Sequence, residues 1–430
     1  MADGNPPNSE QPQSKRRWFS LRLSLRPRHL VASLLVVEVV LLLSEQFRWF
    51  AFNERKGWTV LIAIAGAGAA MAVMLLWYLA ALVFRWRFQF SIRSLLALTV
   101  AVAVPCSWLT TQLKRAGEQR AAVEVFTKAD VPGYLVNVLY DYEFTVADNF
   151  IWGKPPTGEW LDRLFGGDFF ADVTSLDIDD FGSDIHIATF ELRNLKYLSR
   201  IEAIRLGNVE LRHDDLVDIS TLKRLQVLEL RSQSVTDDVL RHLEGMTQLR
   251  RLSLGETNIT DAGLEHLRNL SGLEELNISS TSISEAGLKH LQGLRQLREL
   301  RAYLTKVATI DALRGLPQLR HLSLAYTPIT DAGLEHLEEL DQLQHLDLQD
   351  TQVTDACMRH IVKLKDLREI DLRGTKITDA GLAELEGMVQ LDSVELVGSG
   401  ITGRGIDRLK KALPHLRILL WREENPLATP

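Results

Sequence analysis

The chain has 430 residues, more than one compact hydrophobic core usually supports, so we expect at least two structural regions. Its net charge of -7 conceals an asymmetry, because residues 1–128 carry 16 basic against 7 acidic side chains and the remainder carries 33 against 49. An acidic polar domain argues against nucleic acid as the partner, and the two cysteines, Cys106 and Cys357, are too few for a disulfide scaffold.

The first quarter of the chain contains three apolar segments behind a basic tail. Residues 1–28 are expected to be disordered, and residues 29–113 to form a transmembrane region with about three helices. The segments cover 29–43, 57–84 and 94–113, and the second has 28 residues without a charge, which is ample to span a bilayer. The sequence therefore predicts a multi-pass membrane protein.

Lysine and arginine residues beside these segments predict the orientation. With the N-terminus inside, nine basic residues flank the segments on the inner side and six on the outer side. The excess of positive charge favours an inner, cytoplasmic N-terminus. We therefore expect a protein of the cytoplasmic (inner) membrane whose C-terminal domain lies on the non-cytoplasmic side.

Residues 114–172 are expected to join the membrane region to the C-terminal domain. Residues 110–126 are rich in helix-forming side chains, 135–144 alternate as a strand does, and 159–165 resemble a short helix. A repeat solenoid needs a cover over the exposed end of its core, so we assign this segment as a juxtamembrane helix and N-terminal cap.

The C-terminal domain is a series of repeats. The pattern L-x-x-L-x-L-x-x-T-x-I-T-D-A-G-L-x-x-L recurs every 24 residues, apart from one gap of 22 and a last gap of 25. A strand over 173–178 is expected to open the stack. The ten repeats start at Ile201, Leu225, Leu249, Leu273, Leu297, Leu319, Leu343, Leu367, Leu391 and Leu416.

This periodicity predicts an α/β fold: a leucine-rich-repeat solenoid over 173–421, with a tail at 422–430. Parallel strands should line the concave face and short helices the convex face, with the leucines pointing inward. The threonine or serine at the ninth position should bond the backbone, and the T-D pair should cap a helix. Glycines at this turn should allow close packing between coils; they are Gly263, Gly287, Gly333 and Gly381.

The T-D-A-G-L-x-x-L copies resemble the leucine-rich repeats of bacterial repeat proteins. The front end, with SEQFRWFAFNERKGWTVLIAIAG and RWRFQFSIRSLLALTVAVAVPCSWL, resembles planctomycete-type membrane leucine-rich-repeat proteins. The resemblance implies a membrane location and an interaction role, and it supplies no catalytic residues and no cofactor. The repeat at 297–318 departs from the pattern, because ATIDALRGL replaces its turn and two residues are lost.

A row of histidines on the helical side could suggest a metal site. These residues recur in the L-x-H-L turn, but no second type of ligand repeats with them, so we predict no metal. The row consists of His242, His266, His290, His336 and His360.

The outward positions of the strands form a wall of mixed charge suited to a polar protein surface. At the irregular repeat, tyrosines flanked by charged residues have the composition of a binding hot spot. The wider wall includes Arg205, Glu229, Arg231, Glu369, Arg373 and Glu395. The predicted site consists of Arg251, Glu275, Glu299, Arg301, Tyr303, His321, Tyr326, His345, Asp347 and Asp371.

These features predict a membrane-tethered module that binds a protein through its concave face. The alternative is a transmembrane sensor that relays ligand binding through its helices to a separate signalling partner, with Glu38 and Pro105 as its movable parts. An enzyme is not expected, because phosphate-loop, zinc and nucleophile motifs are missing from the sequence. No cofactor is predicted.

Overall fold

The structure is a computed structural model that describes residues 92–128, 134–140, 144–146, 149–151, 172–180, 192–398 and 400–420. Residues from Thr111 onward belong to one compact unit, which is described here by itself. The predicted tails at 1–28 and 422–430, the apolar segments at 29–43 and 57–84, and the short helix at 159–165 lie outside the described residues.

A single sheet runs through the repeats. Its order is β1-β4-β5-β6-β7-β8-β9-β10-β11-β12-β13-β14, where β1 is Tyr134–Tyr140, and every pair is parallel except β1–β4. The repeated strands are β4 (Val173–Asp180), β5 (Ala203–Gly207), β6 (Val227–Arg231), β7 (Arg251–Ser253), β8 (Glu275–Asn277), β9 (Glu299–Arg301), β10 (His321–Ser323), β11 (His345–Asp347), β12 (Glu369–Asp371), β13 (Ser393–Glu395) and β14 (Arg417–Leu419).

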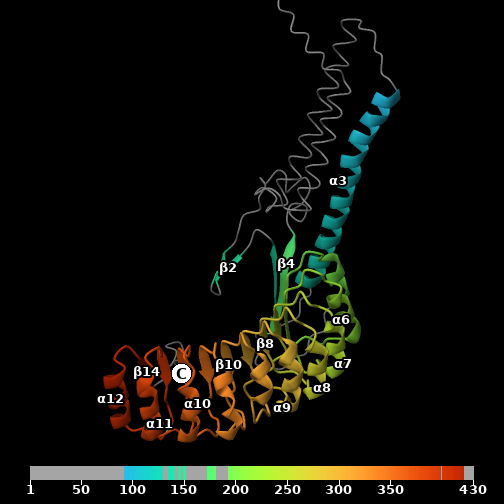
Figure 1. Ribbon diagram of the computed structural model, residues 1–430. Helices are drawn as coiled ribbons and strands as arrows, with labels where there is room; N and C mark the ends of the chain where they lie inside the picture. The colour runs from blue at the N-terminus through green and yellow to red at the C-terminus, as the bar shows by residue number, and fades with distance from the viewer. Residues whose placement is uncertain are drawn as a thin grey trace, which may run out of the picture. The chain divides into compact units, whose positions relative to one another are not determined.

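The return segments are short helical turns, and Figure 1 shows them on the outer side of the curve, with the strands on the inner side. The α-helices are α6 (His213–Ser220), α7 (Asp237–Leu240), α8 (Asp261–Leu264), α9 (Glu285–Leu288), α10 (Met358–Ile361), α11 (Asp379–Glu384) and α12 (Gly403–Ala412). The 3-10 helices are η2 (Leu192–Tyr197), η3 (Arg241–Leu243), η4 (Glu265–Leu267), η5 (Lys289–Gly293), η6 (Asp311–Gly315), η7 (Ala332–Leu334), η8 (Leu337–Glu339), η9 (Asp355–Cys357) and η10 (Leu385–Gly387). The expected short helices are thus partly 3-10, which is the usual geometry for turns of this length.

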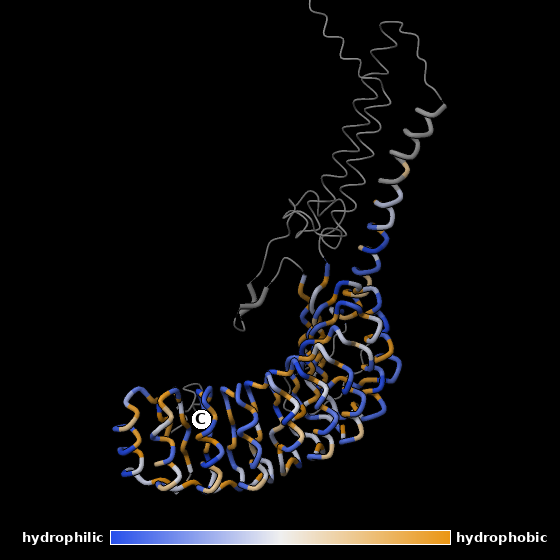
Figure 2. Tube along the Cα trace, viewed as in Figure 1, coloured by the Kyte–Doolittle hydropathy of each residue, from blue (hydrophilic) through white to orange (hydrophobic). Residues whose placement is uncertain are grey.

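The core is one continuous column of aliphatic side chains between the strands and the turns. In the repeat that starts at Leu249, Leu252 and Leu254 of the strand side and Leu264 and Leu267 of the turn are at most 1% exposed. Figure 2 shows the same alternation of apolar and polar residues in every coil. The predicted leucine-lined solenoid with parallel strands is confirmed, and β4 opens its parallel part as expected.

At the first coil, a helix and an antiparallel strand adjoin the solenoid. Helix α3 (Ile92–Thr127) contributes Phe126, which is 0% exposed, to the common core. Strand β1 (Tyr134–Tyr140) pairs along the whole of β4. The strand expected over 135–144 is therefore present, one residue earlier, and described as far as Tyr140. A separate hairpin joins β2 (Phe144–Val146) to β3 (Asn149–Ile151).

The third apolar segment, 94–113, falls on the first part of α3, where the structure describes the backbone but few of the side chains. Among the residues described, no helix is long and apolar enough to cross a membrane.

The ninth-position hydroxyls have the structural role that the sequence predicts. Thr257 donates to the carbonyl of Leu254 at 2.6 Å, and Thr351 donates to that of Leu348 at 2.7 Å. Both threonines are at most 5% exposed, so the bond satisfies a polar group that would otherwise be buried alone. The same bond is made by Thr281, Thr305, Thr327 and Thr375.

The T-D pair does more than cap a helix. Asp355 accepts both the backbone N–H of Thr378, at 2.7 Å, and its hydroxyl, at 2.6 Å, from the next coil. The Thr378 side chain also accepts a hydrogen bond from the backbone N–H of Ala380, and this bond is the predicted helix cap. The Thr260 side chain makes no such cap and bonds only to the preceding coil. Corresponding bonds are accepted by Asp237, Asp261, Asp331 and Asp379. We call this row the aspartate ladder.

The ladder explains three of the four predicted turn glycines, Gly263, Gly287 and Gly381, whereas Gly333 lies against the backbone carbonyl of Ala308. A Cβ on Gly381 would lie 2.3 Å from Oδ1 of Asp355, and one on Gly263 would lie 2.4 Å from Oδ1 of Asp237. The predicted close packing between coils is thus confirmed with a specific cause. Cys357 takes the glycine position in one coil; it is buried there, and burial raises the pKa of its thiol to about 12.

Candidate functional site

The outward side chains of the strands lie in two rows, on either side of the buried middle residue of each strand. Parallel pairing fixes this arrangement, because residues one repeat apart stand side by side in register. We call the surface made by these rows the strand face. Of the predicted site residues, Arg251, Glu275, Glu299, Arg301, His321, His345, Asp347 and Asp371 lie on its strands, and Tyr303 and Tyr326 follow β9 and β10.

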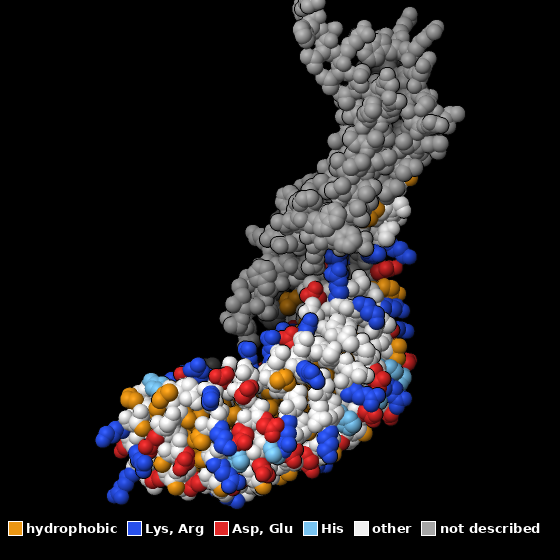
Figure 3. Space-filling view, in the orientation of Figure 1, with side chains coloured by type: hydrophobic (Ala, Val, Ile, Leu, Met, Phe, Trp, Pro, Cys, Tyr) orange, Lys and Arg blue, Asp and Glu red, His pale blue; other side chains and the backbone are white. Residues whose placement is uncertain are grey.

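At its N-terminal end, the strand face pairs opposite charges. Arg205 contacts Asp177 at 3.0 Å through Nη1 and Glu229 at 2.9 Å through Nε. Further along, Arg301 and Glu299, which are both predicted site residues, form another ion pair. Figure 3 shows basic and acidic side chains interspersed over the visible surface of the coils. Much of the predicted mixed-charge wall is therefore internally compensated.

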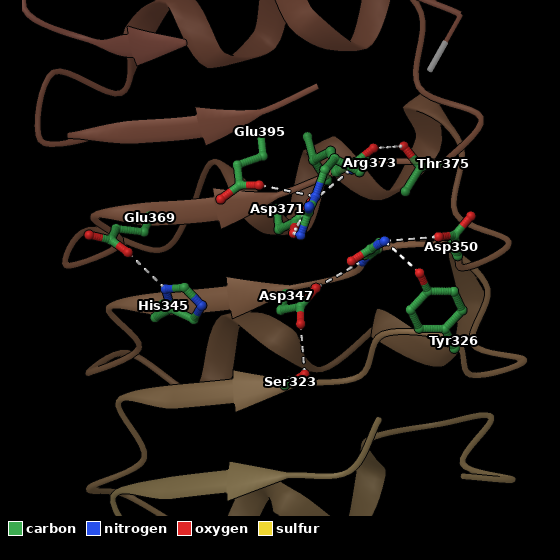
Figure 4. Close-up of polar contacts among 12 residues, drawn as sticks. Ser323, Tyr326, His345, Asp347, Asp350, Glu369, Asp371, Arg373, Thr375 and Glu395 are labelled. Carbon is green, nitrogen blue, oxygen red and sulfur yellow. Dashed lines mark hydrogen bonds and ion pairs between the residues drawn. The ribbon is translucent and has the colours of Figure 1, made fainter. Parts of the chain in front are cut away.

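The C-terminal end of the strand face carries more acid than base. Arg373 is paired twice, with Asp371 and, at 3.0 Å, with Glu395 (Figure 4). Partial burial and the neighbouring Asp371 raise the pKa of Glu395, although Arg373 opposes this shift. The carboxylates here are thus close enough to repel one another.

The two predicted histidines stack in the row beside these carboxylates. The rings of His321 and His345 lie 5.8 Å apart at an angle of 22°. His345 Nδ1 lies 3.1 Å from Oε2 of Glu369 on the next strand. The structure therefore brings together His321, His345, Asp347 and Asp371, while Arg251 and Glu275 lie several coils away on β7 and β8.

One backbone position after the strands bears two large exposed apolar side chains. Leu304 has a φ of 52° and is 51% exposed, and Tyr326 has a φ of 56° and is 47% exposed. Neighbouring coils fix this left-handed conformation, because Leu304 donates its N–H to Ala325 and Tyr326 donates to Gln349. The same left-handed position recurs in other coils, where it holds Asn208, Glu256, Ser280, Asp350, Gly374 and Gly398. Asparagine, aspartate and glycine tolerate it more easily than a bulky apolar residue does.

The Tyr326 hydroxyl is part of a polar contact at the edge of the strand face. Gln349 Nε2 donates to this hydroxyl at 2.6 Å and to Asp350 Oδ2 at 3.1 Å. Loss of solvent around the ring and the nearby Asp350 raise the pKa of Tyr326. Figure 4 shows the Tyr326 hydroxyl directed toward the side of Asp350, with Asp347 to one side of the ring on the neighbouring strand.

Leu304, Gln349 and Asp350 were not among the predicted site residues. Tyr303 was a predicted site residue, and its side chain is only partly exposed. The signal that could have identified Leu304 is its place in the repeat, where the other coils carry small or polar residues. A bulky apolar residue there cannot serve the core, because that position points outward.

The irregular coil keeps its strand and loses its turn. Glu299, His321 and His345 remain in unbroken register, so the two missing residues come from the outer side. Only the 3-10 turn η6 remains there. Glu285 stands at the place of the ladder aspartate, and the residue 23 positions later, where regular coils have threonine or serine, is Ala308, which has no hydroxyl.

The histidines of the outer side lie beside carboxylates and other histidines. His242 packs edge-on against His213 with ring centres 4.2 Å apart, and His266 lies 2.5 Å from Glu244. Within the described ranges, no group of three or more His, Cys, Asp and Glu side chains is placed to hold a metal ion.

Comparison with known families identifies the repeats. A family model described as "Leucine rich repeat" matches residues 247–302, and a second of the same description matches residues 316–337 and 363–385. These coils are leucine-rich repeats, a fold typical of binding modules rather than enzymes. The likeness to planctomycete-type membrane proteins stays a prediction.

Solved structures that match this chain include two internalins of Listeria monocytogenes. One is 17% identical, with 58% of this chain and 87% of that chain covered and a TM-score of 0.41. The other, an internalin C2, is 21% identical, with 53% and 86% covered and a TM-score of 0.36. A complex of TLR13 with a single-stranded RNA is 20% identical, with 53% and 34% covered and a TM-score of 0.41. These values are too low for a function to be carried over, and comparison with curated proteins gave no match.

Proposed function

We propose that this protein is a membrane-tethered recognition or scaffold module that binds a protein partner through its strand face. The observation that carries the proposal is the exposure of Leu304 and Tyr326 on backbone that disfavours bulky residues. The left-handed backbone recurs through the repeats, at Glu256 and Ser280 among others, so Leu304 and Tyr326 differ from these positions in having large, exposed apolar side chains. Exposed aromatic and aliphatic side chains beside charged groups are the usual anchors of protein interfaces.

The membrane part of the proposal rests on the sequence. The apolar segments at 57–84 and 94–113 have the length and composition of spans, and their basic flanks favour an inner N-terminus. In this arrangement the repeats meet partners on the non-cytoplasmic side. Reporter fusions after residues 90 and 430 test it, and a cytoplasmic signal from the second fusion would contradict the placement.

Photocrosslinking tests the binding face. A photoreactive amino acid is placed at Arg251 or His321, which lie on the strand face. As the matched control it is placed at Lys289 or Glu384, which lie on the outer turns and outside the proposed surface. Irradiation of cells that produce the full chain should give protein adducts from the first pair only. Adducts from the outer positions alone would refute the proposal.

A further inference from the structure

The C-terminal part of the strand face combines two features that the packing of the solenoid does not require. Leu304 and Tyr326 present half-exposed apolar surface in neighbouring coils. Carboxylates follow immediately in the next coils, and their charge is only partly compensated by the single guanidinium of Arg373. The exposed or half-exposed members are Asp347, Asp350, Glu369 and Glu395, whereas Asp371 is buried and paired with Arg373.

We propose that this surface receives a cationic polypeptide segment, with an arginine side chain over the ring of Tyr326 and an aliphatic residue against Leu304. The inference rests on the proposed function and specifies the chemistry of the partner. It commits to a basic protein segment, because the excess charge of the surface is negative and its apolar part is next to that charge.

The geometry around Tyr326 suits a guanidinium in particular. An aromatic face attracts a cation within about 6 Å of its centre, and planar guanidinium groups bond carboxylates through two N–H groups at once. Asp350 lies near the Tyr326 hydroxyl, and Asp347 lies to one side of the ring on β11 (Figure 4). One oxygen of Asp347 accepts from Ser323 at 2.8 Å, and one of Asp350 accepts from Gln349 at 3.1 Å, so both carboxylates are held in place.

The remainder of the strand face would not select such a segment. At its N-terminal end Arg205 is neutralised from both sides by Asp177 and Glu229, and Arg231 lies 3.9 Å from Glu256. A cationic chain would meet compensated charge there. The segment is therefore expected to lie over β10 to β13 and to leave β5 and β6 uncovered.

Selection from a random peptide library on the full chain tests the inference. The enriched peptides should contain arginine together with a leucine, isoleucine or valine, and one of them is synthesised with a fluorescent label as the probe. Its affinity for the full chain should fall steeply between about 50 and 300 mM salt, because exposed charges are screened over this range.

Substitutions in the full chain then show where the labelled peptide binds. The double variant Asp347→Asn with Asp350→Asn should bind it at least about tenfold more weakly, and Tyr326→Ala should do the same. Asparagine tolerates the left-handed backbone of residue 350, so the fold should be kept. The controls are Glu384→Gln on α11 and Tyr197→Ala, an exposed tyrosine of η2, and neither should change the affinity.

Three results would overturn the inference: no enrichment, enrichment of neutral or acidic peptides, or equal binding by the asparagine variants. Direct binding of a labelled single-stranded RNA to this surface of the full chain would overturn it as well, because the surface would then prefer an anion. Failure here remains distinct from failure of the proposed function. Strand-face crosslinks without a cationic segment in the adduct would reject the inference alone, whereas their absence would reject both.

Discussion

Leu304 and Tyr326 hold a left-handed backbone that costs an L-residue with a Cβ roughly 1–2 kcal/mol. Asparagine adopts this conformation more easily, because its short side chain can bond the local backbone. We therefore expect Leu304→Asn to raise the free energy of unfolding by about 1 kcal/mol, which urea denaturation of the full chain would measure.

Leu304→Ala is the matched control, since it removes the same side chain and keeps the strained backbone. It should not stabilise the protein. If both variants are less stable than the natural chain, Leu304 contributes to packing and its exposure has no functional meaning. A gain in stability that accompanies loss of binding would instead mark the residue as one retained for function.

Single residues also show what the sequence can predict. The ninth-position threonines were assigned correctly, because a small hydroxyl recurring beside a buried turn has few other uses, and Thr257 and Thr351 make the expected bonds. Tyr303 was placed at the centre of the site on residue type alone. Which side of a turn faces solvent depends on a backbone angle that periodicity does not encode, so Leu304 was missed.

At the scale of the element, the aspartate ladder joins each helical turn to the next. Asp355→Ala removes two bonds to Thr378 and should lower the free energy of unfolding by about 1–2 kcal/mol. Glu285→Ala is the control, because Glu285 has the same place in the repeat at the gap in the ladder, and it should cost much less. Equal losses in urea denaturation would show that the ladder adds nothing beyond the helix itself.

A double-mutant cycle sharpens this prediction. Gly381→Ala alone places a Cβ 2.3 Å from Oδ1 of Asp355, so something must shift and stability should fall. In the Asp355→Ala background that oxygen is absent, and the same change should cost less. Because contacting residues couple, the two losses should be less than additive.

The ladder also shows why the turns were predicted only in part. T-D before a helix is a known cap, and Thr378 does cap α11. The bond from one coil to the next depends on the stacking distance between coils, which the pattern of a single repeat does not contain. The absence of a full turn in the irregular coil was visible in the sequence, whereas its unbroken strand register required the structure.

For the whole molecule, repetition made the fold predictable. The 24-residue period determines how many strands stack and in which order, so the parallel sheet from β4 to β14 followed from the sequence. The ends of the solenoid are not repeated, and there single-sequence reasoning was weaker. The expected strand at 135–144 was located, but its antiparallel pairing with β4 was not predicted.

The linear design implies that damage at one end stays at that end. Phe126 of α3 is 0% exposed and Leu409 of α12 is 1% exposed, so each joins the core near one terminus of the stack. Because each coil contacts only its neighbours, stability is close to a sum of local terms.

Phe126→Ala should cost roughly 3–5 kcal/mol locally and speed hydrogen exchange of the β4 and β5 amides, while those of β12 and β13 stay protected. Leu409→Ala, the control at the opposite end, should give the reverse pattern. Uniformly faster exchange in either variant would mean that the solenoid unfolds as a single cooperative unit.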